Sequence, residues 1–219
     1  MLWKFLYPDC SSTLIFFCIN PFAYKKMNEL YPVFLKVSQL NILLVGAGKV
    51  GLEKLTFLLK SSPHAHVTVV AKEVWQEVST LADQHPHITL LIDEYNEKYL
   101  AAKHIVIAAT NDREINQQIY SDAKERYLLV NVADTPELCD FYLGGIVTKG
   151  NVKIAISTNG KSPTTAKRLR QFLEEVIPDD INEMVENLNV YRDSLKGDLE
   201  YKVEALNKLT EGLLGRKKD

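Results

Sequence analysis

The sequence predicts an α/β protein: a Rossmann-like domain with a parallel sheet, followed by a small hairpin segment and a helical C-terminal region. Apolar runs of strand length alternate with segments of helical periodicity between Ile42 and Val132. Glycines in G-x-G-x-x-G spacing follow the first apolar run. The pattern then changes at Lys149–Asn151, where two extended segments flank a turn.

The first strand and the segments on either side of its turn predict a dinucleotide site. Ile42–Val45 reads as a strand buried on both faces, and Leu52–Lys60 as a helix with one leucine-rich face. Gly46 permits a tight turn between them, Gly48 lets a pyrophosphate approach the backbone, and Gly51 lets the helix lie close to the strand. The pyrophosphate would bind the unpaired N–H groups at the helix N-terminus. The alternative is a glycine turn with a structural role alone.

The segments that follow continue the alternation of strands and helices. Further strands are expected at His66–Ala71, Ile88–Ile92, His104–Ala109 and Tyr127–Val132, and helices at Val74–Gln84 and Arg113–Arg126. Thr110 and Asn111 follow the fourth strand at the sheet edge where open α/β folds bind ligands. Asn111 or Asp112 can cap the next helix.

The end of the second strand carries the residues that meet the cofactor's ribose in this fold class. The acidic residue expected there is missing, because Ala71 and Lys72 occupy the position and Glu73 comes one residue later. A lysine at this place is also compatible with a 2′-phosphate. The choice between NAD and NADP therefore stays open.

A β-hairpin and helices are expected in the last third of the chain. Phe141–Thr148 and Val152–Ser157 are the two arms of the hairpin. The helix Thr164–Val176 follows, with Ser162 as its N-cap and Pro163 at its first position. From Ile181 onward the pattern is helical, and Gly197 is expected to break it.

Asp134 is the first candidate for chemistry, because it follows the fifth strand beside the expected nicotinamide end of the site. A carboxylate there, partly withdrawn from water, can serve as a general base. The alternative is that Asp134 only caps the turn at Thr135–Pro136.

A second candidate is an anion-binding loop at the start of the helix Thr164–Val176. Its residues are Ser157, Thr158, Asn159, Gly160, Lys161 and Ser162. Hydroxyls, free N–H groups and the nearby Lys167, Arg168 and Arg170 suit carboxylates or phosphate. An exposed turn beside a solvated basic helix face explains the pattern equally well.

Three other patterns are interpreted as structural. Tyr120 and Lys124 have the spacing of a reductase pair, yet Ile107 stands where the matching serine belongs. The pairs His64/His66 and His85/His87 have no carboxylate or cysteine near them in sequence, so solvated loop histidines are favoured over a stable metal site. Cys139 has no neighbouring histidine and is interpreted as a packed thiol.

Composition is that of an ordinary globular protein, with 46% hydrophobic residues, 25% charged residues and a net charge of -2, so nucleic acid is not indicated as a partner. Three cysteines without metal-like spacing favour a reducing compartment, and we expect a cytoplasmic protein. The apolar run Ser12–Ile19 is too short to span a membrane, which takes about 20 residues. We interpret residues 1–26 as an extension preceding a functional start at Met27.

Four motifs together resemble the precorrin-2 dehydrogenase/sirohydrochlorin ferrochelatase family, which also forms the N-terminal module of siroheme synthase. They are Val45–Val50, Ala108–Asp112, Val130–Asp134 and Ile154–Pro163. The resemblance implies an NAD-binding domain (27–137), a hairpin segment for dimerisation (138–163), a helical region (164–219) and a homodimer. It also implies oxidation of precorrin-2 to sirohydrochlorin with NAD, followed in bifunctional members by insertion of Fe²⁺ as a substrate.

The resemblance assigns roles to individual residues. Asp134 corresponds to the family's essential aspartate, as base and as a guide for Fe²⁺. Cofactor positions fall on Lys49, Val50, Lys72 and Glu73, and Thr158 falls where a family serine can be phosphorylated. Two alternatives remain open: a dehydrogenase that relies on a separate chelatase, and a regulatory module that senses the dinucleotide without turnover.

Overall fold

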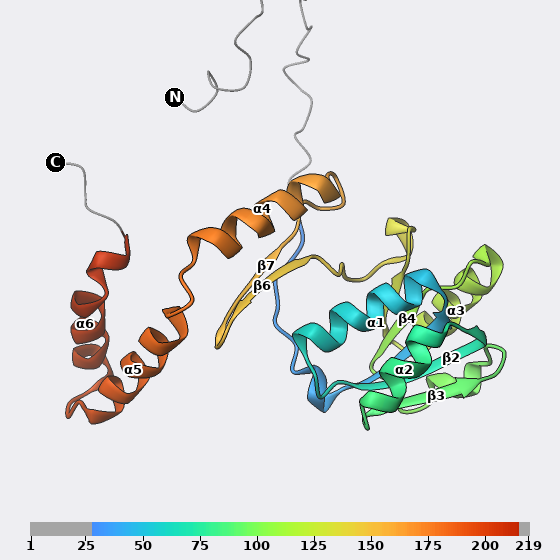
Figure 1. Ribbon diagram of the computed structural model, residues 1–219, viewed down its shortest axis with the longest axis horizontal. Helices are drawn as coiled ribbons and strands as arrows, with labels where there is room; N and C mark the ends of the chain where they lie inside the picture. The colour runs from blue at the N-terminus through green and yellow to red at the C-terminus, as the bar shows by residue number, and fades with distance from the viewer. Residues whose placement is uncertain (1–27, 215–219) are drawn as a thin grey trace, which may run out of the picture. The chain divides into compact units, whose positions relative to one another are not determined.

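The computed structural model describes residues 28–214 (Figure 1). The chain divides into two units, Met1–Pro32 and Val33–Asp219, and the helices and strands given below all lie in the second. The expected extension at residues 1–26, with Cys10 and Cys18, lies outside the described residues.

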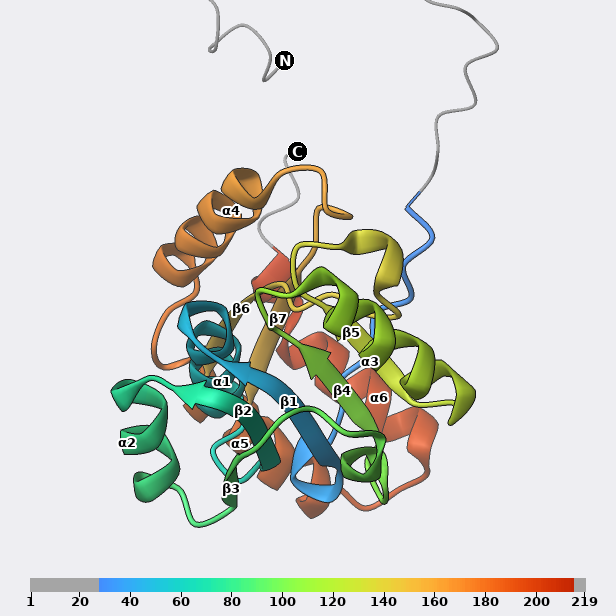
Figure 2. The same cartoon turned by 90° about the vertical axis from the view of Figure 1, so that its right-hand side faces the viewer.

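Five parallel strands form the main sheet, in the order β3-β2-β1-β4-β5. Their bounds are β1 Asn41–Ala47, β2 His66–Val74, β3 Ile88–Ile92, β4 Ile105–Ala108 and β5 Leu129–Val132. β1 lies between β2 and β4, and the carboxyl ends of the parallel strands meet at one edge of the sheet (Figure 2). All five strands were predicted, and the Rossmann-like architecture is confirmed.

Helices cover both faces of this sheet (Figure 1). α1 (Lys49–Ser61) and α2 (Gln76–Gln84) bury Leu55, Leu59 and Val78 in the apolar cluster on one face. α3 (Arg113–Glu125) buries Ile119 and Ala123 in the cluster on the other. Short 3-10 helices lie at η2 Val37–Gln39, η3 Glu97–Leu100, η4 Pro136–Leu138 and η5 Glu211–Leu214.

The last third of the chain has the predicted hairpin and helices. β6 (Gly145–Lys149) pairs antiparallel with β7 (Val152–Ile156). Three helices follow: α4 Pro163–Val176, α5 Ile181–Ser194 and α6 Leu199–Leu209. Gly197, at φ +149°, lies in the break between α5 and α6, as predicted. None of the helices in residues 28–214 combines the length and the apolarity of a membrane span.

One boundary differs from the prediction in a way that matters for the site. Val74 was expected to begin a helix, but β2 continues to Val74 and α2 begins at Gln76. The end of β2 is bonded to the end of β1, because the Trp75 N–H donates to the Ala47 carbonyl at 3.0 Å. Trp75 is thereby held beside the glycine turn.

The proposed division into domains at residues 137/138 and 163/164 stays a prediction. Only the boundary between Pro32 and Val33 is marked by the contacts of the chain.

Candidate active site

The turn between β1 and α1 requires glycine at two of its three positions. Gly46 has φ +105°, and a Cβ there would lie 2.4 Å from the Ala109 carbonyl oxygen. A Cβ on Gly51 would lie 2.1 Å from the carbonyl oxygen of Gly46. The tight turn and the close approach of α1 are therefore confirmed as the reasons for these glycines.

Gly48 differs, because its surroundings are open. The nearest atom to a Cβ built on it is the indole Nε1 of Trp75, at 3.9 Å. Gly48 is the N-cap of α1, and no side chain caps that helix end. The N-terminal N–H groups of α1 are thus left for an anion, which fits the pyrophosphate of a dinucleotide.

The segment after β4, which begins with Thr110, is held by an asparagine of α3 that was not predicted from the sequence. Asn116, only 7% exposed, accepts a hydrogen bond from the Thr110 hydroxyl at 2.7 Å and donates to the Thr110 carbonyl at 3.0 Å. Asp112 caps α3 by accepting from the N–H groups of Glu114 and Ile115, so the cap is Asp112 and not Asn111. Asn111 therefore does not cap α3, and it is exposed.

Asp134 sits on a turn that β5 anchors. The buried side chain of Asn131 donates to the Phe141 carbonyl at 2.8 Å, and Asp140 accepts from the Val130 N–H at 3.0 Å. The Cys139 thiol lies 3.2 Å from the Val132 carbonyl oxygen, and burial raises the pKa of this thiol. These contacts agree with the packed-thiol interpretation of Cys139 and fix both ends of the turn.

Asp134 itself adopts a left-handed backbone conformation, with φ +57°. Such a conformation is uncommon outside glycine, although aspartate tolerates it better than most residues. Its carboxylate accepts no hydrogen bond from any residue in the range 28–214, so the turn-capping alternative finds no support. Asp134 is exposed, and the expectation of a partly withdrawn carboxylate is wrong for the single chain.

A cavity of about 510 Å³ brings four of the predicted residues together: Val50, Thr110, Asn111 and Asp134. They come from the start of α1, the end of β4 and the end of β5. Arg113, Asn116 and Gln117 on α3 also line it and were not predicted. The cavity therefore places one carboxylate, one guanidinium and several hydrogen-bonding groups beside the glycine turn.

The loop Ser157–Ser162 does not line this cavity. Hydrogen bonds within the loop and to α4 hold its conformation. The Thr158 hydroxyl donates to the Ser162 carbonyl at 3.0 Å, and Ser162 caps α4 by accepting from the Thr165 N–H. Asn159 and Gly160 have positive φ values of +53° and +70°. Arg170 pairs with Glu174 at 2.5 Å, so part of the expected positive charge is neutralised within α4. Substrate binding by Ser157–Ser162 stays a prediction.

Lys72 and Glu73 do not line this cavity and lie near the carboxyl end of β2. Both are exposed. The ammonium group of Lys72 pairs with the Glu94 carboxylate at 2.9 Å, and this bond raises the pKa of Lys72. Sequence spacing gave no sign of Glu94, since it follows β3 and approaches β2 only through the sheet.

Three of the four histidines in the sequence pairs His64/His66 and His85/His87 lie close together in the structure. The rings of His66 and His87 are 4.8 Å apart, and those of His64 and His87 are 5.9 Å apart. His85 instead contacts the Leu81 carbonyl. Across residues 28–214 no group of histidine, cysteine, aspartate and glutamate is arranged to hold a metal ion.

Two protein-family models match the chain. One, described as "Putative NAD(P)-binding", matches residues 33–145, and the other, described as "Sirohaem biosynthesis protein central", matches residues 149–175. The chain is similar to the siroheme synthase of Psychrobacter cryohalolentis, with 36% identity over 176 residues that cover 80% of this chain and 32% of the relative. For the siroheme synthase of Pseudoalteromonas atlantica the identity is 38% over 168 residues, covering 77% and 36%.

The chain thus spans about a third of the length of these relatives. Its fold is also similar to a solved structure named SirC, precorrin-2 dehydrogenase, with a TM-score of 0.67 and 23% identity. That match covers 82% of this chain and 89% of the other. At this identity the match establishes a shared fold.

Proposed function

The chain belongs to the precorrin-2 dehydrogenase/sirohydrochlorin ferrochelatase family, and from this premise we propose that it oxidises precorrin-2 to sirohydrochlorin in siroheme biosynthesis. NAD⁺ is the proposed acceptor. The observation that carries the proposal is the cavity in which Asp134 lies with Thr110, Asn111 and Val50, beside the open N-terminus of α1.

The residues of the chain have separate roles in this proposal. The N–H groups at the start of α1 would bind the pyrophosphate, and Thr110, held by Asn116, lines the cavity beside them. The bound cofactor supplies a hydride acceptor. Asp134 takes the accompanying proton from the substrate, so the macrocycle loses one hydride and one proton in each oxidation. The side chains of Asn131 and Asp140 hold the backbone on both sides of the turn that carries Asp134.

The unpaired state of the Asp134 carboxylate supports the role of base. A carboxylate whose oxygens accept no hydrogen bond from the protein is free to contact a substrate. Its exposure also leaves room for a flat macrocycle, which a buried aspartate would not.

The experiment is an anaerobic incubation of the full chain with precorrin-2 and NAD⁺, in which NADH and sirohydrochlorin are followed by absorbance. We expect both products to form in equal amounts. Asp134→Asn is expected to bind NADH as the wild type does and to lose turnover by about 10²-fold or more, the usual scale for a general base. Wild-type turnover in Asp134→Asn would contradict the role of base. Dinucleotide binding without any turnover of the wild type would favour a sensing module.

A second reaction, insertion of Fe²⁺ into sirohydrochlorin, is part of the proposal. Asp134 is the one residue that both steps would share, by guiding the ion or accepting a pyrrole proton. Sirohydrochlorin and Fe²⁺ are incubated with the protein, and the rate without protein is subtracted. A rate equal to that background identifies a dehydrogenase that needs a separate chelatase.

The substrate is proposed to contact the loop Ser157–Ser162 through its many carboxylates. Lys161 is exposed, and the N-terminus of α4 adds a positive dipole end. Phosphorylation at Thr158 is less favoured, because its hydroxyl is engaged with the backbone of Ser162.

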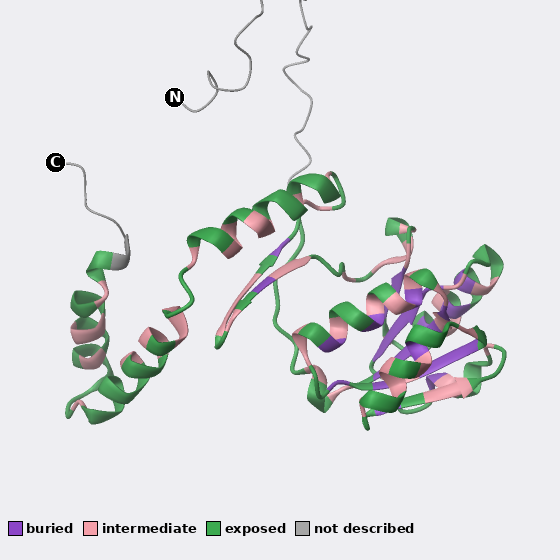
Figure 3. Ribbon diagram, viewed as in Figure 1, coloured by how far each residue is buried: buried purple, intermediate pink, exposed green. Residues whose placement is uncertain are grey.

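We also propose a homodimer in the cytoplasm. Every residue of α4, α5 and α6 is described, and none is buried (Figure 3). On α4 alone, Leu169, Phe172 and Val176 are 44%, 57% and 58% exposed. A second copy would bury this apolar surface, and analytical ultracentrifugation over a range of concentrations tests for it. The free thiol of Cys139 agrees with a reducing compartment.

A further inference from the structure

The end of β2 carries an ion pair at the place where this fold class recognises the adenosine ribose. Lys72 follows the buried part of the strand, and its Nζ lies 2.9 Å from Oε1 of Glu94. In Rossmann folds an acidic side chain here accepts a hydrogen bond from the ribose 2′-hydroxyl, whereas a basic one accommodates the 2′-phosphate of NADP. In this chain an acidic side chain, Glu94, and a basic one, Lys72, lie together at this place.

Strand register brings Glu94 to this corner. Ala71 of β2 is paired with Ile92 of β3, and the Asp93 N–H donates to the Ala71 carbonyl at 3.1 Å. Glu94 is therefore the second residue after β3, beside the end of β2. Its own N–H donates to the Asp93 carboxylate at 2.8 Å.

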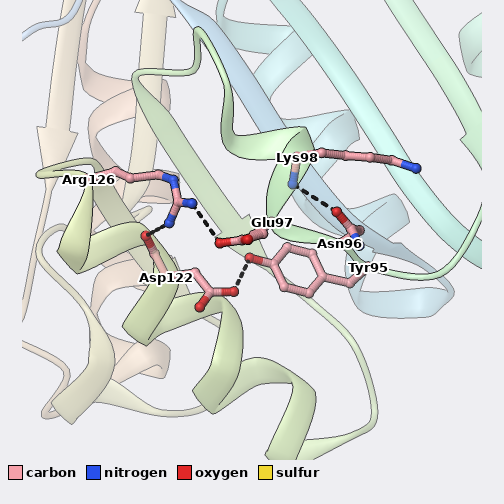
Figure 4. Close-up of polar contacts among 6 residues, drawn as sticks. All are labelled: Tyr95, Asn96, Glu97, Lys98, Asp122 and Arg126. Atoms are coloured by element: carbon pink, nitrogen blue, oxygen red, sulfur yellow. Dashed lines mark hydrogen bonds and ion pairs between the residues drawn. The ribbon is translucent and has the colours of Figure 1, made fainter.

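Figure 4 shows how the segment after Glu94 is fastened to α3. The Tyr95 hydroxyl donates to Asp122 at 2.8 Å, and Arg126 donates to Glu97 at 2.7 Å. Asn96 caps the short helix η3 by accepting from the Lys98 N–H at 3.0 Å. The backbone on both sides of Glu94 is thus fixed, and the side chain can act as a placed group although it is exposed.

The charges near Lys72 include carboxylates that act on its ammonium group. Glu94 raises the pKa of Lys72 by a hydrogen bond and by its charge, and Asp112 adds a smaller effect in the same direction. The ammonium group of Lys72 is thus paired with the Glu94 carboxylate. A 2′-phosphate would have to displace Glu94 from Lys72 and then remain beside that carboxylate, whereas a 2′-hydroxyl meets no such repulsion.

We propose that Glu94 selects NAD over NADP, by accepting a hydrogen bond from the ribose 2′-hydroxyl and by keeping Lys72 from a 2′-phosphate. Glu94 thereby replaces the acidic residue that is missing at the end of β2. The inference rests on dinucleotide binding by the family and not on the tetrapyrrole reaction.

The test is a titration of the full chain with NADH and with NADPH, without tetrapyrrole, followed by nicotinamide fluorescence. The wild type is expected to bind NADH about tenfold more tightly or better, and this preference should shrink at high salt, because it depends on exposed charges. Glu94→Gln keeps the size of the side chain and removes its charge. We expect it to reduce the NADH/NADPH preference about tenfold, mainly by tighter binding of NADPH.

Three further variants sharpen the result. Adding Lys72→Met to Glu94→Gln should remove the gain in NADPH binding, since the gain is expected to come from the ammonium group that Glu94 releases. Glu125→Gln removes the same charge from an exposed residue at the end of α3, outside the segment that carries Glu94, and it should leave the preference unchanged. Glu73→Gln tests the rival carboxylate on β2 and should change the preference less than Glu94→Gln.

An unchanged preference in Glu94→Gln, or a larger change in Glu73→Gln, would overturn the proposal. Tighter binding of NADPH than of NADH by the wild type would overturn it as well. Failure of the wild type to bind either dinucleotide would instead count against the cofactor premise of the proposed function.

Discussion

In the sheet domain Leu55 and Ile119 are completely buried, whereas in the C-terminal helices Phe172 is 57% exposed and Val190 68% exposed. The sheet has an apolar cluster on each face, and helices α1, α2 and α3 seal both. In α4, α5 and α6, described in full, no residue is buried. Figure 3 shows the same contrast.

The difference indicates that the two regions cover their apolar side chains in different ways. The sheet completes its core within its own sequence, because strand and helix alternate and each apolar face meets another. The helices α4, α5 and α6 leave their apolar side chains exposed or only partly buried. We propose that a second copy covers this exposed apolar surface.

The largest expected effect tests this contrast directly. Leu55→Ala should lower the free energy of unfolding by about 2–5 kcal/mol, because it leaves a cavity in a sealed core. Phe172→Ala should lower it by less than about 0.5 kcal/mol at concentrations where the chain is monomeric. Urea denaturation measures both.

Protein concentration provides the control for Phe172. If the cost of Phe172→Ala grows as the concentration rises, then a second copy covers this residue. A cost equal to that of Leu55→Ala at every concentration would mean that the comparison is wrong, and that α4 has a core within its own chain.

The second prediction concerns the glycine turn inside the sheet domain. Gly51→Ala should cost about 1–3 kcal/mol of unfolding free energy, since its Cβ would overlap the Gly46 carbonyl oxygen. Gly48→Ser should leave stability unchanged or slightly raised, because the position is open and serine is a good N-cap. It should nevertheless weaken NADH binding, since the side chain occupies the path of the pyrophosphate. Stability lost in Gly48→Ser would show that the second glycine is structural.

The sequence predicted most of the fold because its signals are local. Ile42–Val45 and His104–Ala109 are apolar runs that fit only a buried strand, and Gly46 and Gly51 stand where a β–α turn needs them. The cap of α3 was narrowed to two residues, and the structure identifies Asp112. The helix break at Gly197 follows equally from local backbone preference.

What the sequence did not predict depends on contacts between distant segments. Asn116 looks like an ordinary helix residue until α3 packs with its side chain against Thr110. Glu94 reaches Lys72 only because β3 pairs with β2, and His87 joins His64 and His66 for the same reason. The exposure of Asp134 was misjudged because burial depends on the surroundings of a turn and not on its residues.

A third prediction concerns the half-buried polar contact between the segment after β3 and α3. Tyr95→Phe should cost about 1 kcal/mol near neutral pH, through loss of the hydrogen bond to Asp122. Burial, followed by that hydrogen bond, raises the pKa of Tyr95 above its ordinary value of 10.0. The stabilisation is therefore complete below about pH 10 and is lost as the pH rises toward the folded-state pKa.

Urea denaturation at about pH 8 and about pH 11 measures this dependence as a difference between wild type and variant. The two proteins should become more similar in stability at the higher pH, because only the wild type loses a proton from residue 95. A difference that does not change with pH would mean that Tyr95 titrates alike in the folded and unfolded states.

The smallest expected effect lies in the C-terminal region, where polar contacts take the place of a core. The Asn182 side chain of α5 accepts from the Asn151 N–H at 2.7 Å, and so holds the turn of the β6–β7 hairpin. Asn182→Ala should cost about 0.5–1 kcal/mol, because water can replace an exposed acceptor. Asn189→Ala is the matched control, since the exposed Asn189 side chain accepts a hydrogen bond from Arg192 of the same helix. Hydrogen exchange should become faster at the Asn151 amide in Asn182→Ala and stay unchanged in Asn189→Ala. A loss in Asn182→Ala as large as that of Leu55→Ala would mean that the hairpin and α5 form a cooperative unit with a core of their own, and the need for a second copy would then disappear.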